Sequence, residues 1–281
     1  MKLVTWNTQW CRGIDGVVSP GRIVEVAGLL ADFDLLCLQE VSVNYPALPG
    51  NPGHDQPALL AALLPGYQLF FGAAVDEIDG NGQRRQFGNL IASRLPVSQV
   101  QHHPLPYPAD GGVRSMPRMC TVVTVQDPQL GPVRVMTTHL EFYSKIQRLA
   151  QAQGLRALHA QACAQALAPP RASRDGTPFQ HKDHTTQAVL CGDFNFEAHE
   201  PGYAEITRPF PYDALFDSWR QLHGDAPHPP SFRLYDRTHG PDPVACDFVF
   251  VSDRLKDHLQ RIDVDGATKV SDHQPIAVEL A

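Results

Sequence analysis

The stretch VLCGDFN at residues 189–195 decides the fold class, because an apolar strand-like run ends there in a glycine and two polar residues. Gly192 lets the backbone turn closely. If the chain stays extended, Asp193 and Asn195 point to the same side. A carboxylate acceptor and an amide donor then face one pocket, where they can hold a water molecule or a phosphate oxygen. An Asx turn at the strand end is the competing explanation.

Five other apolar runs also end in, or begin with, a polar residue that can bind metal or handle protons. They are LVTWN at 3–7, LLCLQE at 35–40, VMTTH at 135–139, CDFVFVS at 246–252, and SDH at 271–273 before PIAVEL. Burying such groups beside apolar strands is costly unless they are paired or bound to metal. The six runs therefore predict strand ends that converge on one polyanion-handling site. Because that site needs both ends of the chain, we expect residues 1–281 to form a single domain.

The local sequence leaves more than one explanation open for three of these polar residues. Glu40 ends a buried run and needs a partner, which is either Mg²⁺ or Mn²⁺ or a structural salt bridge. His273 suits proton transfer or a hydrogen bond to a phosphoryl oxygen, although SDH alone is more typical of a surface turn. His139 either orients a carboxylate or contacts phosphate, or it is a core histidine. Asp247 lies among strand apolars and must pair, and His273 is a plausible partner.

The order of strand-like and helix-like segments favours an α/β fold. Residues 2–7, 20–30 and 34–40 read as a β-α-β opening, with Ser19 and Pro20 as the helix start. A short helix at 57–64, a long one at 144–168 and one near 212–222 accompany nine further strands, at 67–75, 87–93, 97–103, 119–126, 133–139, 187–191 and 245–251 and in two closing segments. Residues 76–86 read as a polar hairpin loop. Two strand-rich halves with outer helices predict two packed sheets covered by helices.

The composition of the chain favours some classes of protein and argues against others. The net charge is −7 and no Lys/Arg-rich block occurs, which argues against tight non-specific DNA binding. A nuclease is still compatible, because a bound cation supplies positive charge at the phosphate. Six cysteines without a CxxC pair and a strand in place of a leader segment at the start favour a reducing cytoplasm. No apolar run approaches the roughly 20 residues of a membrane span.

Several motifs taken in order resemble the endonuclease/exonuclease/phosphatase superfamily of DNase I-like phosphoesterases. They are TWNTQW, LCLQEV, FGNLIASRLPV, TTHLEFYSKIQRLAQ, GDFN, CDFVFVS and SDHQPIAVEL, which together span essentially the whole chain. The resemblance implies a four-layer α/β sandwich of two mixed sheets flanked by helices, with the site at one edge of both sheets. It also implies hydrolysis of a phosphate ester with Mg²⁺ or Mn²⁺. Cys246 is a departure, since many members have an aliphatic residue before this Asp.

The resemblance also assigns roles to the residues that match the motifs. Asn7 and Glu40 match the positions that hold the metal, Glu40 directly, and Asp272 matches a residue that is sometimes assigned to a second metal.

The catalytic positions follow in the same way. Asp193 matches the residue that orients or deprotonates the attacking water, and Asn195 matches its companion on phosphate or metal. His273 matches the histidine that faces the scissile phosphate, with Asp247 as its carboxylate partner. His139 matches a phosphate-contacting histidine found in many members. Whether Asp193 or the His273–Asp247 pair is the base stays open.

We therefore expect a monomeric, metal-dependent phosphodiesterase or nuclease whose substrate is a phosphate ester, nucleic acid among the candidates. The alternative is a phosphatase or phosphodiesterase that acts on a small molecule or lipid headgroup, and a non-catalytic binding module is a remote one. Five arginines either border the site or are surface charges: Arg84, Arg85, Arg114, Arg118 and Arg148.

Overall fold

Two mixed sheets pack face to face in the computed structural model of the protein, which describes residues 1–209 and 213–281. The first sheet consists, in spatial order, of β11 (Leu259–Val264), β12 (Ile276–Leu280), β1 (Lys2–Asn7), β2 (Leu35–Val43), β4 (Arg84–Ser93) and β3 (Gln68–Ile78). The second consists of β5 (Val97–Pro104), β6 (Met119–Asp127), β7 (Gly131–His139), β8 (Ala188–Asp193), β10 (Asp247–Ser252) and β9 (Leu215–Asp217).

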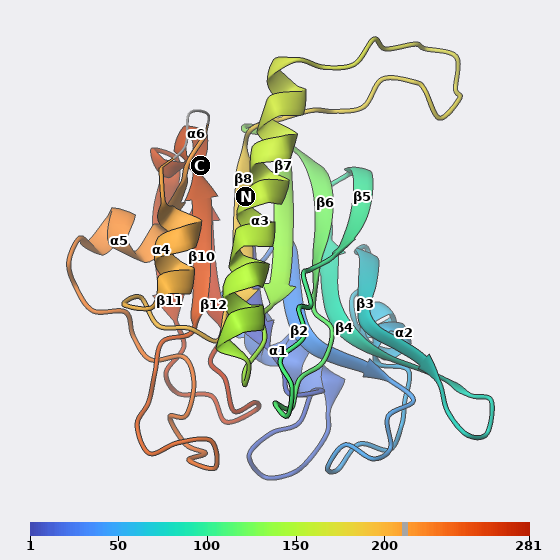
Figure 1. The fold of residues 1–281 in the computed structure, drawn as a ribbon, viewed down its shortest axis with the longest axis vertical. Helices are drawn as coiled ribbons and strands as arrows, with labels where there is room; N and C mark the ends of the chain where they lie inside the picture. Colours follow the sequence, from blue (N-terminus) through green and yellow to red (C-terminus); the bar gives the residue numbers. More distant parts are fainter. Residues whose placement is uncertain (210–212) are drawn as a thin grey trace.

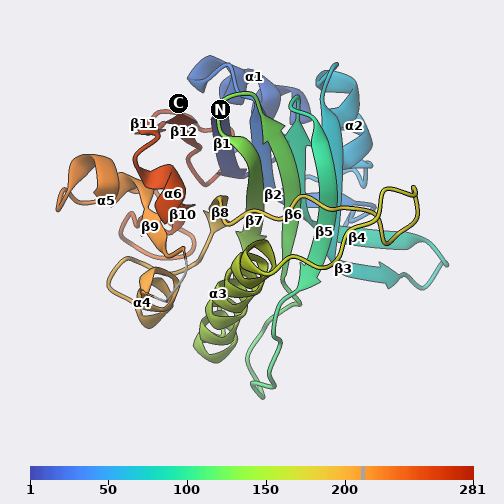
Figure 2. The ribbon, with the colours of Figure 1, turned by 90° about the horizontal axis from the view of Figure 1, so that it is seen from above.

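Helices form the two outer layers. The helices α1 (Pro20–Leu30) and α2 (Gln56–Leu63) cover the first sheet, while α3 (Lys145–Leu167) and α4 (Pro201–Thr207) cover the second (Figure 2). Two short helices, α5 (Ser218–His223) and α6 (Asp253–Lys256), lie near β9 and β10. The predicted four-layer α/β sandwich is confirmed.

The central strands are buried on both faces, which explains their continuous apolar sequences. In β1, Leu3 packs into the core between the sheets, and Val4 packs into the core under the helices. In β8, Val189 and Leu190 divide in the same way between the inner core and the layer beneath α3 and α4. Full burial of each such side chain contributes about 1.5–3 kcal/mol. These strands therefore cannot slip by one residue without exchanging the contents of two cores.

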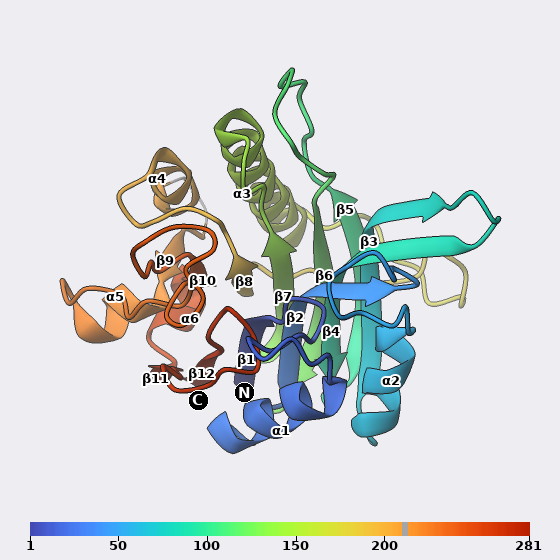
Figure 3. The same ribbon diagram turned by 90° about the horizontal axis from the view of Figure 1, so that it is seen from below.

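Strand direction brings the polar strand ends to one edge of the molecule. β1 runs parallel to β2, and β7 runs parallel to β8. β12 and β10 run antiparallel to β1 and β8, so these strands begin where β1 and β8 end. The loops that join these ends gather at the bottom of Figure 1, and Figure 3 views the molecule from that side.

The predicted polar hairpin at residues 76–86 is confirmed, but its loop is shorter than expected, because most of the segment belongs to the two paired strands of an arm. β3 continues to Ile78 and β4 begins at Arg84, so the connecting turn is short. Arg84 pairs with Asp76 at 2.6 Å, and Asp79 accepts backbone hydrogen bonds across the turn from Asn81 and Gln83. The arm is polar because it is exposed, and opposite charges facing across a strand pair stabilise it.

The predicted helix near residues 212–222 is also partly wrong, and residue 212 lies outside the described residues. Leu215–Asp217 forms strand β9, and the helix α5 begins only at Ser218. Asp217 caps that helix by accepting a hydrogen bond from the Trp219 amide at 2.8 Å. The helix α4 was missed in the sequence, because its seven residues are too few for a clear helical period.

All six cysteines are free and buried. Within the described part of the chain, none of the helices combines the length and the apolar content that crossing a bilayer demands.

We predict that Gly192→Ala lowers the free energy of unfolding by about 3 kcal/mol or more. Gly192 has φ +137°, and an added Cβ would collide with the Thr138 carbonyl of the neighbouring strand. Gly28→Ala is the matched control, because Gly28 lies in α1 with open space around it. In the control, the free energy of unfolding should rise by about 0.5–1 kcal/mol. Urea unfolding measures both, and equal stability of the two variants would contradict the packing described for Gly192.

Candidate active site

A cavity of about 620 Å³ opens at the edge where the polar strand ends meet. Six of the eight predicted site residues line it: Glu40, His139, Asp193, Asn195, Asp272 and His273. The other two, Asn7 and Asp247, are buried behind this wall and hydrogen-bond to residues that line it. The structure thus brings all eight residues together.

Asn7 connects carboxylates that come from different sheets. Its Nδ2 donates to Asp193 Oδ2 at 2.9 Å and to Glu40 Oε1 at 3.3 Å. Its Oδ1 accepts from the Gln9 amide at 3.1 Å. The side chain that sequence analysis placed at a metal therefore holds two acidic groups in position in this arrangement.

Glu40 reaches the cavity because β2 is irregular at this point. Leu38 packs toward the helices and Gln39 toward the other sheet, so regular alternation would turn Glu40 toward the helices. A register shift between Leu38 and Val41, together with φ +60° at Glu40, aims the carboxylate into the cavity. Bulges beside functional sites commonly re-aim a side chain in this way. A non-glycine residue in the left-handed region costs of the order of 1 kcal/mol or more.

The GDFN stretch forms an Asx turn, and Asp193 and Asn195 both line the cavity. The Asn195 amide donates to Asp193 Oδ1 at 2.9 Å, which is an Asx turn, and Asn195 has φ +52°. The expectation of an extended chain is therefore wrong at this position. Asn195 still lines the cavity, because its Nδ2 donates to the Leu140 carbonyl at 2.9 Å and fixes the side chain there.

His273 and Asp247 form a buried hydrogen-bonded pair, with 2.8 Å between Nδ1 and Oδ2. Ser231 Oγ donates to the same Asp247 oxygen at 2.7 Å. The ring of Phe232 stacks on the His273 imidazole with the centroids 4.2 Å apart. Sequence analysis missed Ser231, because it lies in a loop without periodicity, and it did not link Phe232 to His273. The one available signal was the step from polar Ser231 to apolar Phe232, ahead of the strand that begins with Asp247.

His139 lies between Asp193 and Glu40. Its Nε2 is 3.3 Å from Asp193 Oδ2, and its Nδ1 is 3.8 Å from Glu40 Oε1. Burial, with the charges of Arg118 and His273, holds the pKa of His139 well below its usual value. The imidazole is therefore neutral at pH 7 and has one N–H to donate.

Three acids, Glu40, Asp193 and Asp272, form an acidic wall of the cavity. Their negative charge exceeds the positive charge around them. Burial, and then the charge of Asp272, raises the pKa of Glu40 to about 7. Burial, and then Asp247, raises the pKa of Asp193 to about 6. Burial alone would lower the pKa of His273, but Asp247 and Asp193 together raise it to about 10. His273 is thus a cation at neutral pH.

Two of the five arginines noted in the sequence line the cavity. Arg118 pairs with buried Glu141 at 3.2 Å, and Arg114 stacks over the Tyr143 ring. Arg84 and Arg85 pair with acids of the exposed arm, and Arg148 donates to the carbonyls of residues 141 and 142.

The donors on the wall fit a hard divalent cation. Glu40 and Asp272 offer carboxylate oxygens to the cavity, and burial raises the pKa of both groups. Carboxylate oxygens are the protein ligands that Mg²⁺ and Mn²⁺ prefer. The cations that lower the pKa of Glu40 are His273 and Arg118, and Arg118 is already paired with Glu141. A bound cation would therefore relieve an unfavourable burial of charge.

Comparison with known proteins gives a consistent result. The model of the Endonuclease/Exonuclease/phosphatase family matches residues 4–273. An endonuclease/exonuclease/phosphatase from Beutenbergia cavernae is 25% identical, with a TM-score of 0.67 over 100% of this chain and 72% of its own.

Two further solved structures share the fold. A mannosyl-6-phosphatase from Bacteroides thetaiotaomicron is 18% identical, with a TM-score of 0.64 over 100% of this chain and 99% of its own. TDP2 from D. rerio, complexed with a single-strand DNA product, is 17% identical, with a TM-score of 0.64 over 100% and 98%. No curated protein matches the chain.

We predict that the metal-free protein loses stability as the pH rises from about 6.5 to 8, above the range in which the low pKa of His139 acts in the opposite direction. The folded pKa values of Glu40, Asp193 and His273 lie above their ordinary values. Their favourable contribution is complete below the unfolded pKa values and is lost as the pH rises through the folded ones. For Glu40 the contribution is lost between about pH 4.5 and 7, and this lowers the free energy of unfolding by about 1–3 kcal/mol.

Melting temperatures in EDTA, Mg²⁺ and Mn²⁺ at several pH values measure this effect. The metals should raise the melting temperature more at pH 8 than at pH 5, and Glu40→Gln should flatten the dependence between about pH 6.5 and 7. A melting temperature that is independent of pH in EDTA between about pH 6.5 and 8 would contradict the charge balance described for the wall.

Proposed function

The chain belongs to the endonuclease/exonuclease/phosphatase family, and we propose that it hydrolyses phosphate esters with Mg²⁺ or Mn²⁺, with phosphodiesters such as nucleic acids as its main substrates. The observation that carries the proposal is the cavity wall, where the acids Glu40, Asp193 and Asp272 face the histidines His139 and His273. Glu40 and Asp272 would hold the cation, with Asn7 beside them. When bound, it would offset the charge that develops on the phosphoryl oxygens.

Asp193 is the base in this proposal. Its pKa of about 6 leaves it ionised at neutral pH and still basic enough to take a proton from the attacking water. The Asn7 and Asn195 hydrogen bonds fix the two carboxylate oxygens, so the group is held ready for the water. These contacts support Asp193, rather than the His273–Asp247 pair, as the base in this proposal.

His273 acts as a cationic hydrogen-bond donor, because its pKa of about 10 keeps it protonated. Asp247 accepts from Nδ1 and orients the ring, so that Nε2 faces Asp193 with 3.7 Å between Nε2 and Oδ2. Neutral His139 donates a second hydrogen bond to a phosphoryl oxygen. Donors that are already in place where negative charge develops lower the barrier without reorganisation.

A small-molecule or lipid-headgroup phosphate ester is the second candidate. The net charge of −7 favours it, because a duplex-binding enzyme usually carries a basic face. The cavity size supports the same candidate, since about 620 Å³ holds a ligand of drug size.

We further propose that residues 1–281 act as one domain, because the last strand pairs with the first and completes the first sheet. The six free thiols support a reducing compartment such as the cytoplasm. That the protein is a monomer stays a prediction.

We predict that Asp193→Asn and His273→Gln each lower kcat by about 10²–10⁴-fold and leave the fold intact. His228→Gln is the matched control. His228 also pairs with a buried acid, at 2.6 Å from Asp217, but it does not line the cavity. The control should keep kcat within about threefold, and circular dichroism checks folding. Full activity of Asp193→Asn would disprove the role of Asp193 as the base and would leave this residue without a catalytic role.

We also predict cleavage of phosphodiesters in a metal-dependent panel. The panel compares single- and double-stranded DNA, RNA, bis-p-nitrophenyl phosphate, p-nitrophenyl phosphate and inositol phosphates. EDTA should abolish turnover, and Mg²⁺ or Mn²⁺ should restore it. Cleavage of monoesters alone would replace the phosphodiesterase proposal with the phosphatase.

A further inference from the structure

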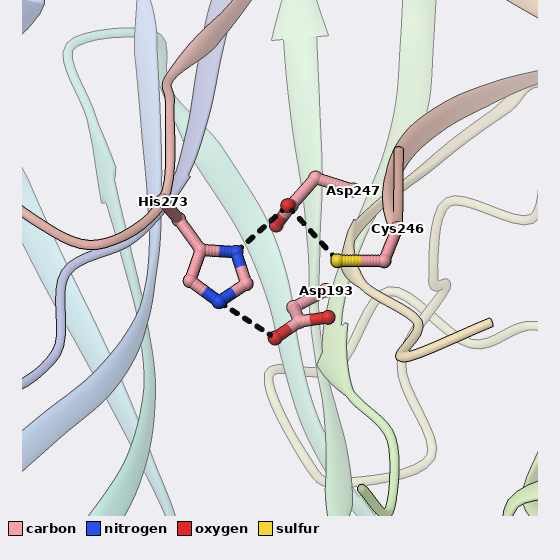
Figure 4. Close-up of side chains that lie close together, drawn as sticks. All are labelled: Asp193, Cys246, Asp247 and His273. Carbon is pink, nitrogen blue, oxygen red and sulfur yellow. Dashed lines mark hydrogen bonds and ion pairs between the residues drawn. The ribbon is translucent and has the colours of Figure 1, made fainter. Parts of the chain in front are cut away.

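A second group of potential metal ligands shares Asp193 and His273 with the cavity wall and adds the buried Asp247 and the thiol of Cys246. Asp193 ends β8, Cys246 and Asp247 begin β10, and His273 precedes β12. Asp247 lies opposite Asp193 in the sheet register. One ligand atom from each of the four side chains lies within 4.8 Å of all the others, and all four residues are buried. Figure 4 shows them pointing toward a common centre.

The present hydrogen bonds leave ligand capacity in this group. Asp247 Oδ2 receives Ser231, His273 and, at 3.6 Å, the Cys246 thiol. The other oxygen, Oδ1, is buried and has no hydrogen-bond partner. An orphaned carboxylate oxygen on a side chain that is 95% buried is unfavourable, and a metal ion is one group that would satisfy it.

The donor set of this group differs from that of Glu40 and Asp272. It offers one sulfur, one imidazole nitrogen and two carboxylates, whereas Glu40 and Asp272 offer oxygen only. Thiolate and imidazole select zinc-like ions, and magnesium avoids them. Four ligands also match the usual tetrahedral coordination of zinc, with bonds of about 2.0–2.3 Å. The two sites are thus selective for different ions.

We propose that Asp193, Cys246, Asp247 and His273 form an inhibitory site for Zn²⁺ and similar thiophilic cations. On binding, zinc–sulfur, zinc–nitrogen and zinc–oxygen bonds form, and the Cys246 thiol proton and the proton between His273 and Asp247 leave to solvent. No electron is transferred. Inhibition rests on the proposed function, because the ion would occupy the base Asp193 and remove the charged donor His273.

A Co²⁺ titration tests the site directly and needs no substrate. Co²⁺ reports on sulfur ligation through a thiolate-to-metal charge-transfer band in the near ultraviolet. The reduced full-length chain should develop the band, and Cys246→Ser should lose it. Cys246→Val is a second variant in case serine perturbs the strand, and circular dichroism and melting confirm the fold of each.

Cys163→Ala is the matched control, because Cys163 also lies beside a histidine, 3.6 Å from His159 Nε2. This variant should keep the band of the wild-type chain. A wild-type chain without the band, or a band that survives in Cys246→Ser, would overturn the proposed site. A band lost in Cys163→Ala would move the site to α3.

Hydrolysis measured with Mg²⁺ and increasing Zn²⁺ tests inhibition separately. Wild type should be inhibited, and Cys246→Ser should need about tenfold more Zn²⁺ or higher. Equal sensitivity of the two proteins would refute inhibition through this site. If no substrate is hydrolysed at all, the proposed function fails, while the cobalt band still decides whether the metal site exists.

Discussion

The burial of carboxylates at one edge of two packed sheets is the constraint on which the site depends. Glu40, Asp193 and Asp272 lie where burial raises the pKa of each, with few cations to offset their charge. Such an arrangement is unfavourable for folding and persists only if the surrounding structure enforces it. The same excess of negative charge is what makes the cavity attractive to a divalent cation.

The surrounding structure enforces it through contacts between the sheets. Gln39 of β2 donates to Thr137 of β7 at 2.8 Å, and Asn7 of β1 donates to Asp193 of β8 at 2.9 Å. The segment before β12 is tied to β1 in a similar way, since Ser271 Oγ donates to the Asn7 carbonyl at 2.8 Å. The site therefore requires both sheets and both ends of the chain.

The sequence predicts the features that follow from buried periodic strands. Apolar runs such as 189–191 indicate strands, and the polar residues at their ends indicate a shared edge. It does not predict the left-handed conformations of Glu40 and Asn195, because these depend on a register shift and a turn that tertiary contacts select. The sequence also does not predict the roles of Ser231 and Phe232. Their contacts with Asp247 and His273 join segments more than ten residues apart, and no local pattern indicates such contacts.

The central claim is that the oxygen donors of the acidic wall hold the divalent cation of a phosphoesterase. An anomalous difference map from crystals grown with Mn²⁺ tests this claim most directly. The account predicts a peak in the cavity within about 2.0–2.3 Å of carboxylate oxygens of Glu40 and Asp272. A peak that avoids both residues, or a wall that stays without Mn²⁺ at millimolar concentration, would contradict it.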